Sequence, residues 1–201
     1  MSRIGIFGGT FNPIHNGHTM LAKYCMDELG LDKVILIPTY MPPHKKSNYL
    51  ASETDRFNMC CLACENFDGF EVSDIEIKRK GKSYSYQTLT SLKELYNKDE
   101  LFFIMGADMF LSLDKWKNPE IIFQKASIIA VPRDISSVRK LEEYYKNIIS
   151  SMGAKAYILP NPVMQVSSTY IRENIENYNT VRDLIDSKVY DYIISNNLYR
   201  M

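Results

Sequence analysis

Short apolar runs alternate with longer segments of helical periodicity along most of this chain, and this alternation constrains its fold more than any other feature. The predicted strands are residues 3–7, 33–37, 101–105, 126–131 and 156–159, with 70–77 a further extended stretch. The predicted helices are 16–29, 52–67, 84–96 and 186–198. Such alternation is typical of βαβ units around a parallel sheet. We predict the α/β class, with a doubly wound, Rossmann-like parallel sheet and helices on both faces, and with ligands at the carboxyl ends of the strands.

Local signals fix two of the predicted helix ends and suggest a single domain. Ser52 is a candidate N-cap, and Gly30 stands where a left-handed residue would end a helix. The 201 residues suit one α/β domain over 1–201, and no repeat or low-complexity linker divides them. Within that domain, residues 161–201 are expected to be mostly helical.

Charge and cysteine content exclude several classes of protein. The chain has 24 basic and 24 acidic residues, so no overall charge favours nucleic acid or a membrane surface as partner. The apolar run before Gly8 is too short for a signal peptide or a membrane span, and we expect a cytoplasmic protein. Cys25, Cys60, Cys61 and Cys64 do not resemble a disulfide framework. Buried thiols are expected; the alternative, half a zinc site at Cys61-x-x-Cys64, would need two more ligands.

The segment between the first predicted strand and the first predicted helix has the properties of a phosphate-binding loop. Residues 8–18 read GGTFNPIHNGH. Gly8 and Gly9 allow backbone to approach a ligand closely, and the helix that follows offers free N–H groups. His15 and His18, three residues apart, can face one ligand from the first helical turn. The alternatives for these residues are an ordinary loop, a metal-binding pair or surface histidines.

A second polar segment, VSSTYIR at residues 166–172, follows the last predicted strand. Ser167 or Ser168 can cap a short helix whose amides face phosphate, and Arg172 can add a planar, charged donor from the same turn. An N-capped surface helix is the alternative.

Together, H-x-G-H and V-S-S-T-Y-I-R resemble the two signatures of a nucleotidyltransferase superfamily. Four further segments resemble the bacterial nicotinate-nucleotide adenylyltransferase family, and they are IPTYMPPHK at 37–45, R-F-x-M-x-x-L-A at 56–63, SYSYQTL at 83–89 and G-A-D-M-F-x-x-L-x-x-W at 106–116. We interpret 56–63 mainly as packing. The chain departs from the family at Ser85, where threonine is usual, and at 173–183, which lack the expected glycine-containing turn.

The resemblance implies a role for each matching residue. The implied catalytic residues are His15, His18, Lys45 and Arg172. The implied ATP and phosphate ligands are Gly8, Gly9, Thr10, Phe11, Gly17, Arg133, Ser167, Ser168 and Thr169, with Arg133 near the adenine. The implied pyridine nucleotide ligands are Thr39, Tyr84, Ser85, Thr88, Gly106, Asp108 and Trp116. Three of these have simpler alternatives: Lys45 as a solvated loop lysine, Trp116 as a core residue rather than a stacking platform, and Asp108 as a helix cap rather than a ribose ligand or an orienting residue.

The implied reaction transfers AMP from ATP to nicotinate mononucleotide, giving deamido-NAD and pyrophosphate in NAD biosynthesis. Mg²⁺ would be carried by the nucleotide phosphates rather than by protein ligands. ATP and nicotinate mononucleotide are then the partners, with a homo-oligomer as an open alternative. Other hypotheses are nicotinamide mononucleotide or phosphopantetheine as acceptor, a non-catalytic nucleotide sensor, and a metal hydrolase with His15, His18 and His44 as ligands.

Overall fold

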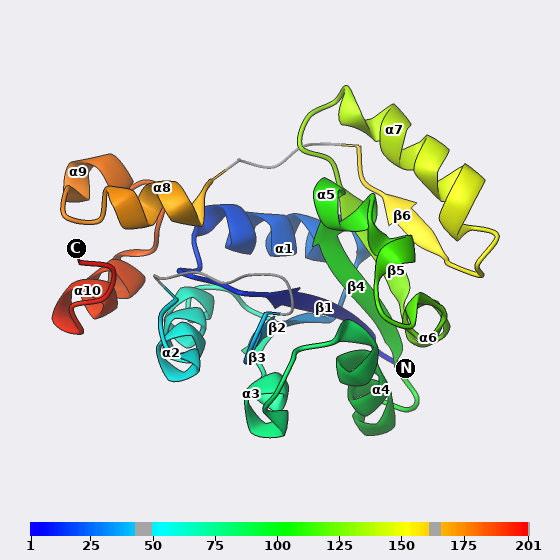
Figure 1. The fold of residues 1–201 in the computed structure, drawn as a ribbon, viewed down its shortest axis with the longest axis horizontal. Helices are drawn as coiled ribbons and strands as arrows, with labels where there is room; N and C mark the ends of the chain where they lie inside the picture. Colours follow the sequence, from blue (N-terminus) through cyan, green and yellow to red (C-terminus); the bar gives the residue numbers. More distant parts are fainter. Residues whose placement is uncertain (43–49, 161–165, 201) are drawn as a thin grey trace.

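One parallel sheet forms the centre of the protein (Figure 1), as a computed structural model covering residues 1–42, 50–160 and 166–200 shows. Its strands are β1 (Arg3–Gly9), β2 (Lys33–Pro38), β3 (Phe70–Val72), β4 (Glu100–Gly106), β5 (Ser127–Val131) and β6 (Ala156–Ile158). They lie in the order β3-β2-β1-β4-β5-β6, and every neighbouring pair is parallel. The strand order reverses between β1 and β4, so the predicted doubly wound sheet is confirmed.

Both faces of the sheet are apolar, because successive strand residues point to opposite sides. In β2, Val34 and Leu36 join one core cluster, whereas Ile35 and Ile37 join the other. The first cluster is completed by α1 (Asn16–Leu29), α2 (Glu53–Cys64), α8 (Ser168–Glu173), α9 (Tyr178–Val181) and α10 (Ser187–Ser195). The second is completed by α4 (Ser85–Leu95), α5 (Ala107–Phe110), α6 (Pro119–Lys125) and α7 (Ser137–Tyr144), which runs on into a π-helical turn, Tyr145–Ile149. Helices on both faces are therefore also confirmed.

Two of the predicted helix ends agree with the structure. Helix α1 spans the predicted residues, and Gly30 ends it in the left-handed region at φ 56°. Ser52 caps α2, since its hydroxyl accepts a hydrogen bond from the Asp55 N–H at 3.1 Å. Helix α2 ends at Cys64, three residues before the predicted end at Phe67.

The predicted extended stretch over 70–77 is wrong beyond its first three residues. Strand β3 stops at Val72, and a short helix, α3 (Ile75–Arg79), follows. The sequence Ile75-Glu76-Ile77 alternates like a half-exposed strand, but Glu76 is only 5% exposed, so the polar residue points inward. Helices α6 and α7 were not predicted, and α9 supplies the path that the sequence left open after Arg172.

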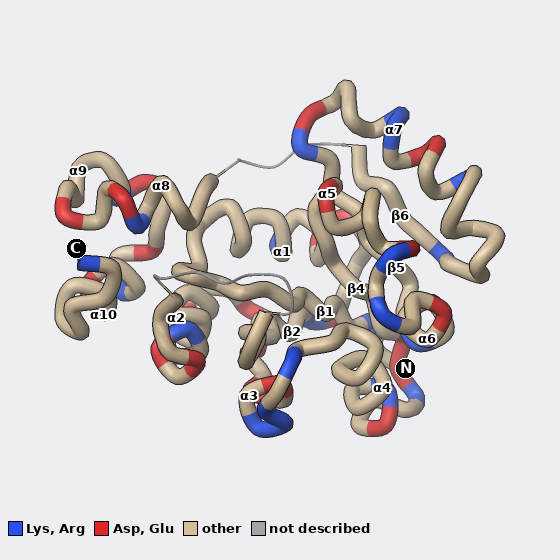
Figure 2. Tube along the Cα trace, in the orientation of Figure 1, with Lys and Arg blue, Asp and Glu red and all other residues tan. Residues whose placement is uncertain are grey.

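Within the central strands β1, β2 and β4, the charged residues lie at the amino ends (Figure 2). Arg3, Lys33 and Glu100 each stand at the first position of a strand. At the other edge, β1 ends in Gly9 and β4 in Gly106, each followed by a loop or helix start. This edge, at the point where the strand order reverses, is where ligands bind in doubly wound sheets.

Three of the four cysteines belong to the core, and Cys61 is only partly buried. Cys25, Cys60 and Cys64 pack in the first cluster, and burial raises the pKa of the Cys25 and Cys64 thiols to about 12.

Within the described ranges, no three His, Cys, Asp or Glu side chains are grouped so that they could hold a metal ion. The part of the chain that the structure describes contains no helix long and apolar enough to cross a membrane.

Candidate active site

Gly8 and Gly9, at the end of β1, differ in the space that a side chain would have at each position. A Cβ on Gly9 would lie 2.8 Å from the Phe11 ring, so the packing of the loop itself excludes a larger residue. Among the described residues, a Cβ on Gly8 would meet only the Phe103 ring, at an ordinary 3.8 Å. Gly8 is solvent-exposed, and the space beside it is open to a ligand approaching the backbone.

The loop after β1 is held in an uncommon shape by contacts from outside it. Phe11 has φ 48°, in the left-handed region that residues with a Cβ rarely adopt. Arg56, on α2, donates through Nη1 to the Thr10 carbonyl at 2.9 Å, and the Ala51 N–H donates to Asn12 Oδ1 at 3.0 Å. Such strained backbone persists only where surrounding structure fixes it, and it concentrates at functional sites.

The two histidines stack at the start of α1. Their ring centroids are 3.7 Å apart, with 24° between the ring planes. The His15 backbone N–H donates to His18 Nδ1 at 3.3 Å. Because Nδ1 accepts this bond, neutral His18 carries its proton on Nε2, which makes that nitrogen a donor. His18 is partly buried.

His15 is more deeply buried, at 6% exposure, and burial lowers its pKa from 6.5 to about 4. The imidazole is therefore neutral at pH 7. Its Nδ1 has no hydrogen-bond partner among the described residues. A neutral imidazole can donate one hydrogen bond to a phosphate oxygen, but it brings no full charge.

The two sequence signatures, far apart in the chain, meet in space. Helix α8 is capped by Ser167, which accepts from the Tyr170 N–H at 3.4 Å. Ser168 Oγ donates to the Pro13 carbonyl at 3.0 Å. Arg172 donates through Nη1 to the Asn12 carbonyl at 2.7 Å and through Nη2 to Thr169 Oγ1 at 3.1 Å. Helix α8 is thus fastened to the loop that carries both histidines.

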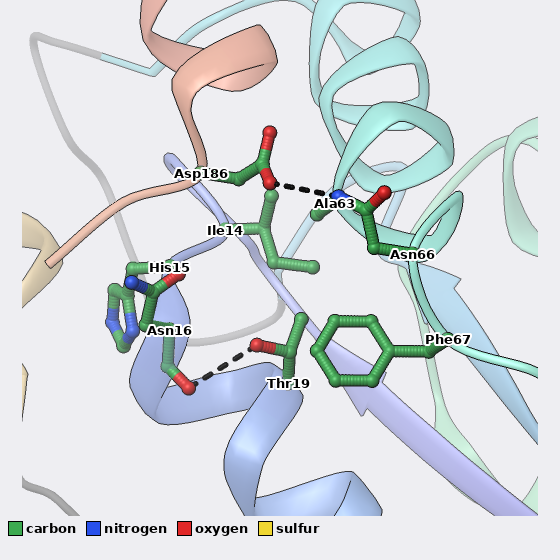
Figure 3. Close-up of a pocket in the computed structure, with 8 residues that line it drawn as sticks. All are labelled: Ile14, His15, Asn16, Thr19, Ala63, Asn66, Phe67 and Asp186. Carbon is green, nitrogen blue, oxygen red and sulfur yellow. Dashed lines mark hydrogen bonds between the residues drawn. The ribbon is translucent and has the colours of Figure 1, made fainter. Parts of the chain in front are cut away.

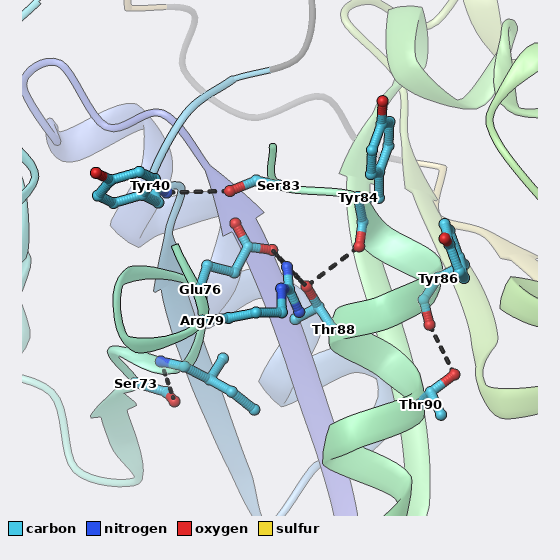
Figure 4. Close-up of polar contacts among 10 residues, drawn as sticks. Tyr40, Ser73, Glu76, Arg79, Ser83, Tyr84, Tyr86, Thr88 and Thr90 are labelled. Carbon is cyan, nitrogen blue, oxygen red and sulfur yellow. Dashed lines mark hydrogen bonds and ion pairs between the residues drawn. The ribbon is translucent and has the colours of Figure 1, made fainter. Parts of the chain in front are cut away.

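Next to this loop, the segment before α4 is tied to the connection after β2 (Figure 4). Ser83 accepts from the Tyr40 N–H at 3.0 Å, and its own N–H donates to the Met41 carbonyl at 3.0 Å. The Thr39 N–H donates to the Gly9 carbonyl at 2.9 Å, whereas its buried hydroxyl has no partner in the parts of the chain described. These contacts bring the residues around Thr39 and Tyr84 to the same edge as the phosphate loop.

The Thr88 hydroxyl is engaged within the protein. It donates to Glu76 Oε1 at 2.6 Å and accepts from Arg79 Nη2 at 3.0 Å, and Thr88 is only 4% exposed (Figure 4). Tyr84, the cap residue of α4, and Ser85, its first residue, are partly buried. Of the three predicted pyridine nucleotide ligands in this segment, Tyr84 and Ser85 thus retain exposed surface.

At the end of β4, no atom of the described residues lies within 4 Å of the place that a Cβ on Gly106 would take. Gly106, not Asp108, is the N-cap of α5, so the helix-cap alternative for Asp108 is wrong. Asp108 instead forms an exposed ion pair with Arg133, which follows β5. Trp116 is half-buried: its ring meets Phe103 edge-on at 6.2 Å and packs against the second core cluster.

Arg56 is a structural residue at the border of the site whose contacts the sequence did not indicate. It is 1% exposed, and its guanidinium donates to the carbonyls of Ala51 at 3.1 Å, Thr10 at 2.9 Å and Tyr40 at 3.1 Å. One buried side chain therefore joins the two loops that border the site. The only signal was the arginine in R-F-x-M-x-x-L-A, which we had assigned to packing. Lys45 and His44 lie outside the described residues.

A cavity of about 130 Å³ lies behind the loop (Figure 3), between α1, α2 and the residue before α10. Ile14, His15, Asn16, Thr19, Ala63, Asn66, Phe67 and Asp186 line it. Pockets for small-molecule ligands are typically ~300 Å³ or more. The cavity is too small for a nucleotide. The candidate place for one is the carboxyl edge of the sheet, where ligands bind in doubly wound folds.

Comparison with known proteins is consistent with this geometry. Residues 6–174 match the family described as cytidylyltransferase-like. A probable nicotinate-nucleotide adenylyltransferase from Clostridium tetani is 39% identical over 200 residues, covering 100% of both chains. Its counterpart from Carboxydothermus hydrogenoformans is 41% identical, covering 99% of this chain and 98% of the other. The Plasmodium falciparum nicotinic acid mononucleotide adenylyltransferase, solved with NaAD, has a similar fold, with a TM-score of 0.79 at 21% identity over 99% of this chain and 98% of that one.

Proposed function

The chain belongs to the cytidylyltransferase-like family and, within it, to the nicotinate-nucleotide adenylyltransferases, and from this premise we propose that it transfers AMP from ATP to nicotinate mononucleotide, releasing pyrophosphate and forming deamido-NAD. One observation carries the proposal. Ser168 and Arg172 fasten the second signature to Pro13 and Asn12 of the histidine loop, at the carboxyl edge of β1 and β4. These contacts support our assignment of both signatures to one phosphate-binding surface.

The reaction needs placement more than covalent catalysis. The phosphate of nicotinate mononucleotide is already an anionic nucleophile, so it can attack the α-phosphorus of ATP in line, with pyrophosphate departing on the opposite side. His18 donates from Nε2 to an oxygen of the α-phosphate, and neutral His15 donates a second hydrogen bond. The N–H groups of Asn16 and His18 already donate to the carbonyls of Leu184 and His15. The start of α1 therefore acts through the positive end of its dipole, which favours the charge that grows in the transition state.

Arg172 supplies the positive charge of α8. Its side chain bonds the Asn12 carbonyl and Thr169 and is partly buried, so it acts both on the shape of the loop and on the phosphates. We assign the departing pyrophosphate to Lys45 as well. Thr10, Phe11, Gly17, Ser167 and Thr169 complete the ATP side, with Arg133 toward the adenine.

The site fits a magnesium ion that arrives with the nucleotide. Its donors are imidazoles, a guanidinium, hydroxyls and backbone amides, whereas Mg²⁺ takes oxygen ligands and usually keeps several waters. Phosphate oxygens and water would therefore be its ligands. When bound, the ion neutralises charge on the phosphate chain.

The pyridine nucleotide is assigned to the neighbouring part of the edge. Trp116, which is half-buried, is assigned to stack on the nicotinate ring, with the Tyr84 and Ser85 hydroxyls beside it. Thr39, whose buried hydroxyl has no partner among the described residues, is assigned to the same substrate. Asp108 is assigned to the ribose hydroxyls, which would require it to share its carboxylate with Arg133 or to release it. Because Gly106 has no side chain, it leaves room for the nucleotide at the end of β4.

The deciding experiment measures pyrophosphate release from ATP and Mg²⁺ with nicotinate mononucleotide, nicotinamide mononucleotide or phosphopantetheine at equal concentrations. We expect a clear preference for nicotinate mononucleotide. In the same assay, His18→Ala should lower kcat by ~10²-fold or more, since it removes one donor to the transition-state charge. A folded His18→Ala protein with near-normal kcat would refute this mechanism. Preference for phosphopantetheine would refute the substrate, and ATP binding without turnover would favour a nucleotide sensor.

A further inference from the structure

The last residues of the chain return to the loop that carries the histidines. After α10 ends at Ser195, the Leu198 N–H donates to the Ile193 carbonyl at 3.0 Å, which fastens the tail to its own helix. Tyr199 then adopts φ 63° and donates its hydroxyl to Asn12 Oδ1 at 2.7 Å. In Figure 1 the chain ends among α8, α9 and α10, on the side of the sheet where α8 meets the loop.

Asn12 is where three distant segments meet. Its Oδ1 accepts from the Ala51 N–H at 3.0 Å as well as from Tyr199, and its backbone carbonyl accepts from Arg172 at 2.7 Å. A backbone N–H can only donate, so the bond from Ala51 identifies the amide atom as oxygen, and Tyr199 must be the donor. Asn12 itself is 6% exposed, so these bonds are sheltered from water.

The position of this hydrogen bond gives it a consequence beyond stability. Asn12 follows the left-handed Phe11 and precedes His15 by three residues, in a loop whose shape depends on contacts from outside. Burial raises the pKa of the Tyr199 hydroxyl above its ordinary value. The hydroxyl therefore stays protonated and continues to donate at neutral and moderately alkaline pH.

We propose that Tyr199 is a positioning residue for nucleotidyl transfer: by holding Asn12, its hydroxyl keeps the loop with His15 and His18 in its reactive shape. The catalytic part of this inference rests on the proposed function. Through the same contact, Tyr199 becomes a structural part of the active site. It acts through Asn12 and does not itself contact the substrates.

The chain offers a matched control for Tyr199→Phe. Tyr192, on α10, is also partly buried, and its hydroxyl donates to Asp55 Oδ1 at 2.9 Å and accepts from Asn58 at 3.0 Å, both on α2. Tyr192→Phe thus removes a comparable hydroxyl from the same C-terminal region without touching the loop. If the role of Tyr199 were only structural, both variants would lose thermal stability and neither would lose kcat.

We expect Tyr199→Phe to lower kcat by about fivefold to tenfold, the loss expected for one hydrogen bond that holds a reactive geometry. KM for ATP should change little, and Tyr192→Phe should keep the kcat of the wild type. In an Asn12→Ala background, Tyr199→Phe should cause no further loss, because the two residues act through one contact. Unchanged kcat in Tyr199→Phe, or an equal loss in Tyr192→Phe, would overturn the proposal.

Amide hydrogen exchange tests the positioning without relying on the reaction. Tyr199→Phe should speed exchange in peptides that cover residues 10–18, and Tyr192→Phe should leave them as in the wild type. If wild-type protein released no pyrophosphate with any acceptor, the proposed function would fail, and the exchange result would still decide the role of Tyr199. Exchange that is unchanged in Tyr199→Phe would refute it.

Discussion

The stacked histidines of the loop differ in what they can give to a phosphate. His18 is partly buried, and its Nδ1 accepts from the His15 N–H, so the neutral ring carries its proton on Nε2. His15 is almost wholly buried, and burial holds it in its neutral form with a pKa of about 4. An anionic phosphate beside His15 would favour its protonation. Bound nucleotide should therefore raise this pKa from about 4 toward the ordinary value of a histidine.

The depressed pKa of His15 predicts a pH dependence of stability. The unfolded imidazole takes up its proton near pH 6.5, whereas the folded one does so only near pH 4, so acidification between these values favours the unfolded chain. From pH 7 to pH 5 this group should cost about 2 kcal/mol of unfolding free energy. Urea unfolding at both pH values would measure it.

His15→Asn is the matched variant, because asparagine also suits the cap position that His15 occupies on α1. The variant lacks the titrating group, so its stability should fall less on acidification than that of the wild type. An identical fall in both proteins would mean that His15 is not the group responsible.

At the scale of elements, hydroxyls connect α4 to its surroundings. Thr88 joins α4 to Glu76 and Arg79 of α3, and the segment between these helices carries Ser83 and Tyr84 to the edge of the sheet. The hydroxyl is thus placed to hold the part of the site that we assign to the pyridine nucleotide. Its own burial argues that it acts on the position of its neighbours rather than on the ligand directly.

Thr88→Val should therefore separate the two substrates. The buried Glu76 carboxylate would lose its 2.6 Å donor, and we expect the unfolding free energy to fall by about 1–3 kcal/mol. KM for nicotinate mononucleotide should rise, while KM for ATP should stay near the wild-type value. Steady-state kinetics with each substrate varied in turn would show this.

Thr90→Val is the control on the same helix, since the Thr90 hydroxyl donates only within α4, to the Tyr86 carbonyl at 2.8 Å, among the contacts described. It should leave both KM values unchanged. A rise in KM for ATP in Thr88→Val, or the same change in Thr90→Val, would argue against a link between Thr88 and the pyridine nucleotide.

The elements show what a sequence pattern can and cannot predict. Helix α1 agrees with its prediction to the residue, because a left-handed glycine and regular apolar spacing mark it. The prediction of an extended stretch around Glu76 was wrong because alternating apolar and polar residues do not show whether a carboxylate is buried or exposed. The role of Arg56 in joining two loops could not be predicted, because its hydrogen-bond acceptors are backbone carbonyls, of two loops and of Ala51. A sequence pattern does not show where backbone carbonyls lie in space.

At the scale of the whole molecule, the candidate site depends on contacts across nearly the full length of the chain. Asn12 meets Arg172 and Tyr199, whose positions follow it by 160 and 187 residues. The resemblance to a known family predicted that the two signatures act together. It did not predict the carbonyls that join them, nor Tyr199, because the contact depends on how the C-terminal helices pack on the first face of the sheet. The same strands carry the core clusters of both faces of the sheet.

Because one sheet carries both core clusters, we propose that the chain is a single domain and predict that its two faces unfold together. Ile193, on α10, is 0% exposed in the first cluster, whereas Trp116, the only tryptophan, packs against the second. Ile193→Ala should cost about 2–5 kcal/mol by leaving a cavity. In a cooperative unit, the midpoint of thermal unfolding should fall equally by Trp116 fluorescence and by far-ultraviolet circular dichroism. A fluorescence midpoint that stayed at the wild-type temperature while the dichroism midpoint fell would show that the C-terminal helices unfold separately, and the loop contacts of Arg172 and Tyr199 would then be lost before the rest of the fold.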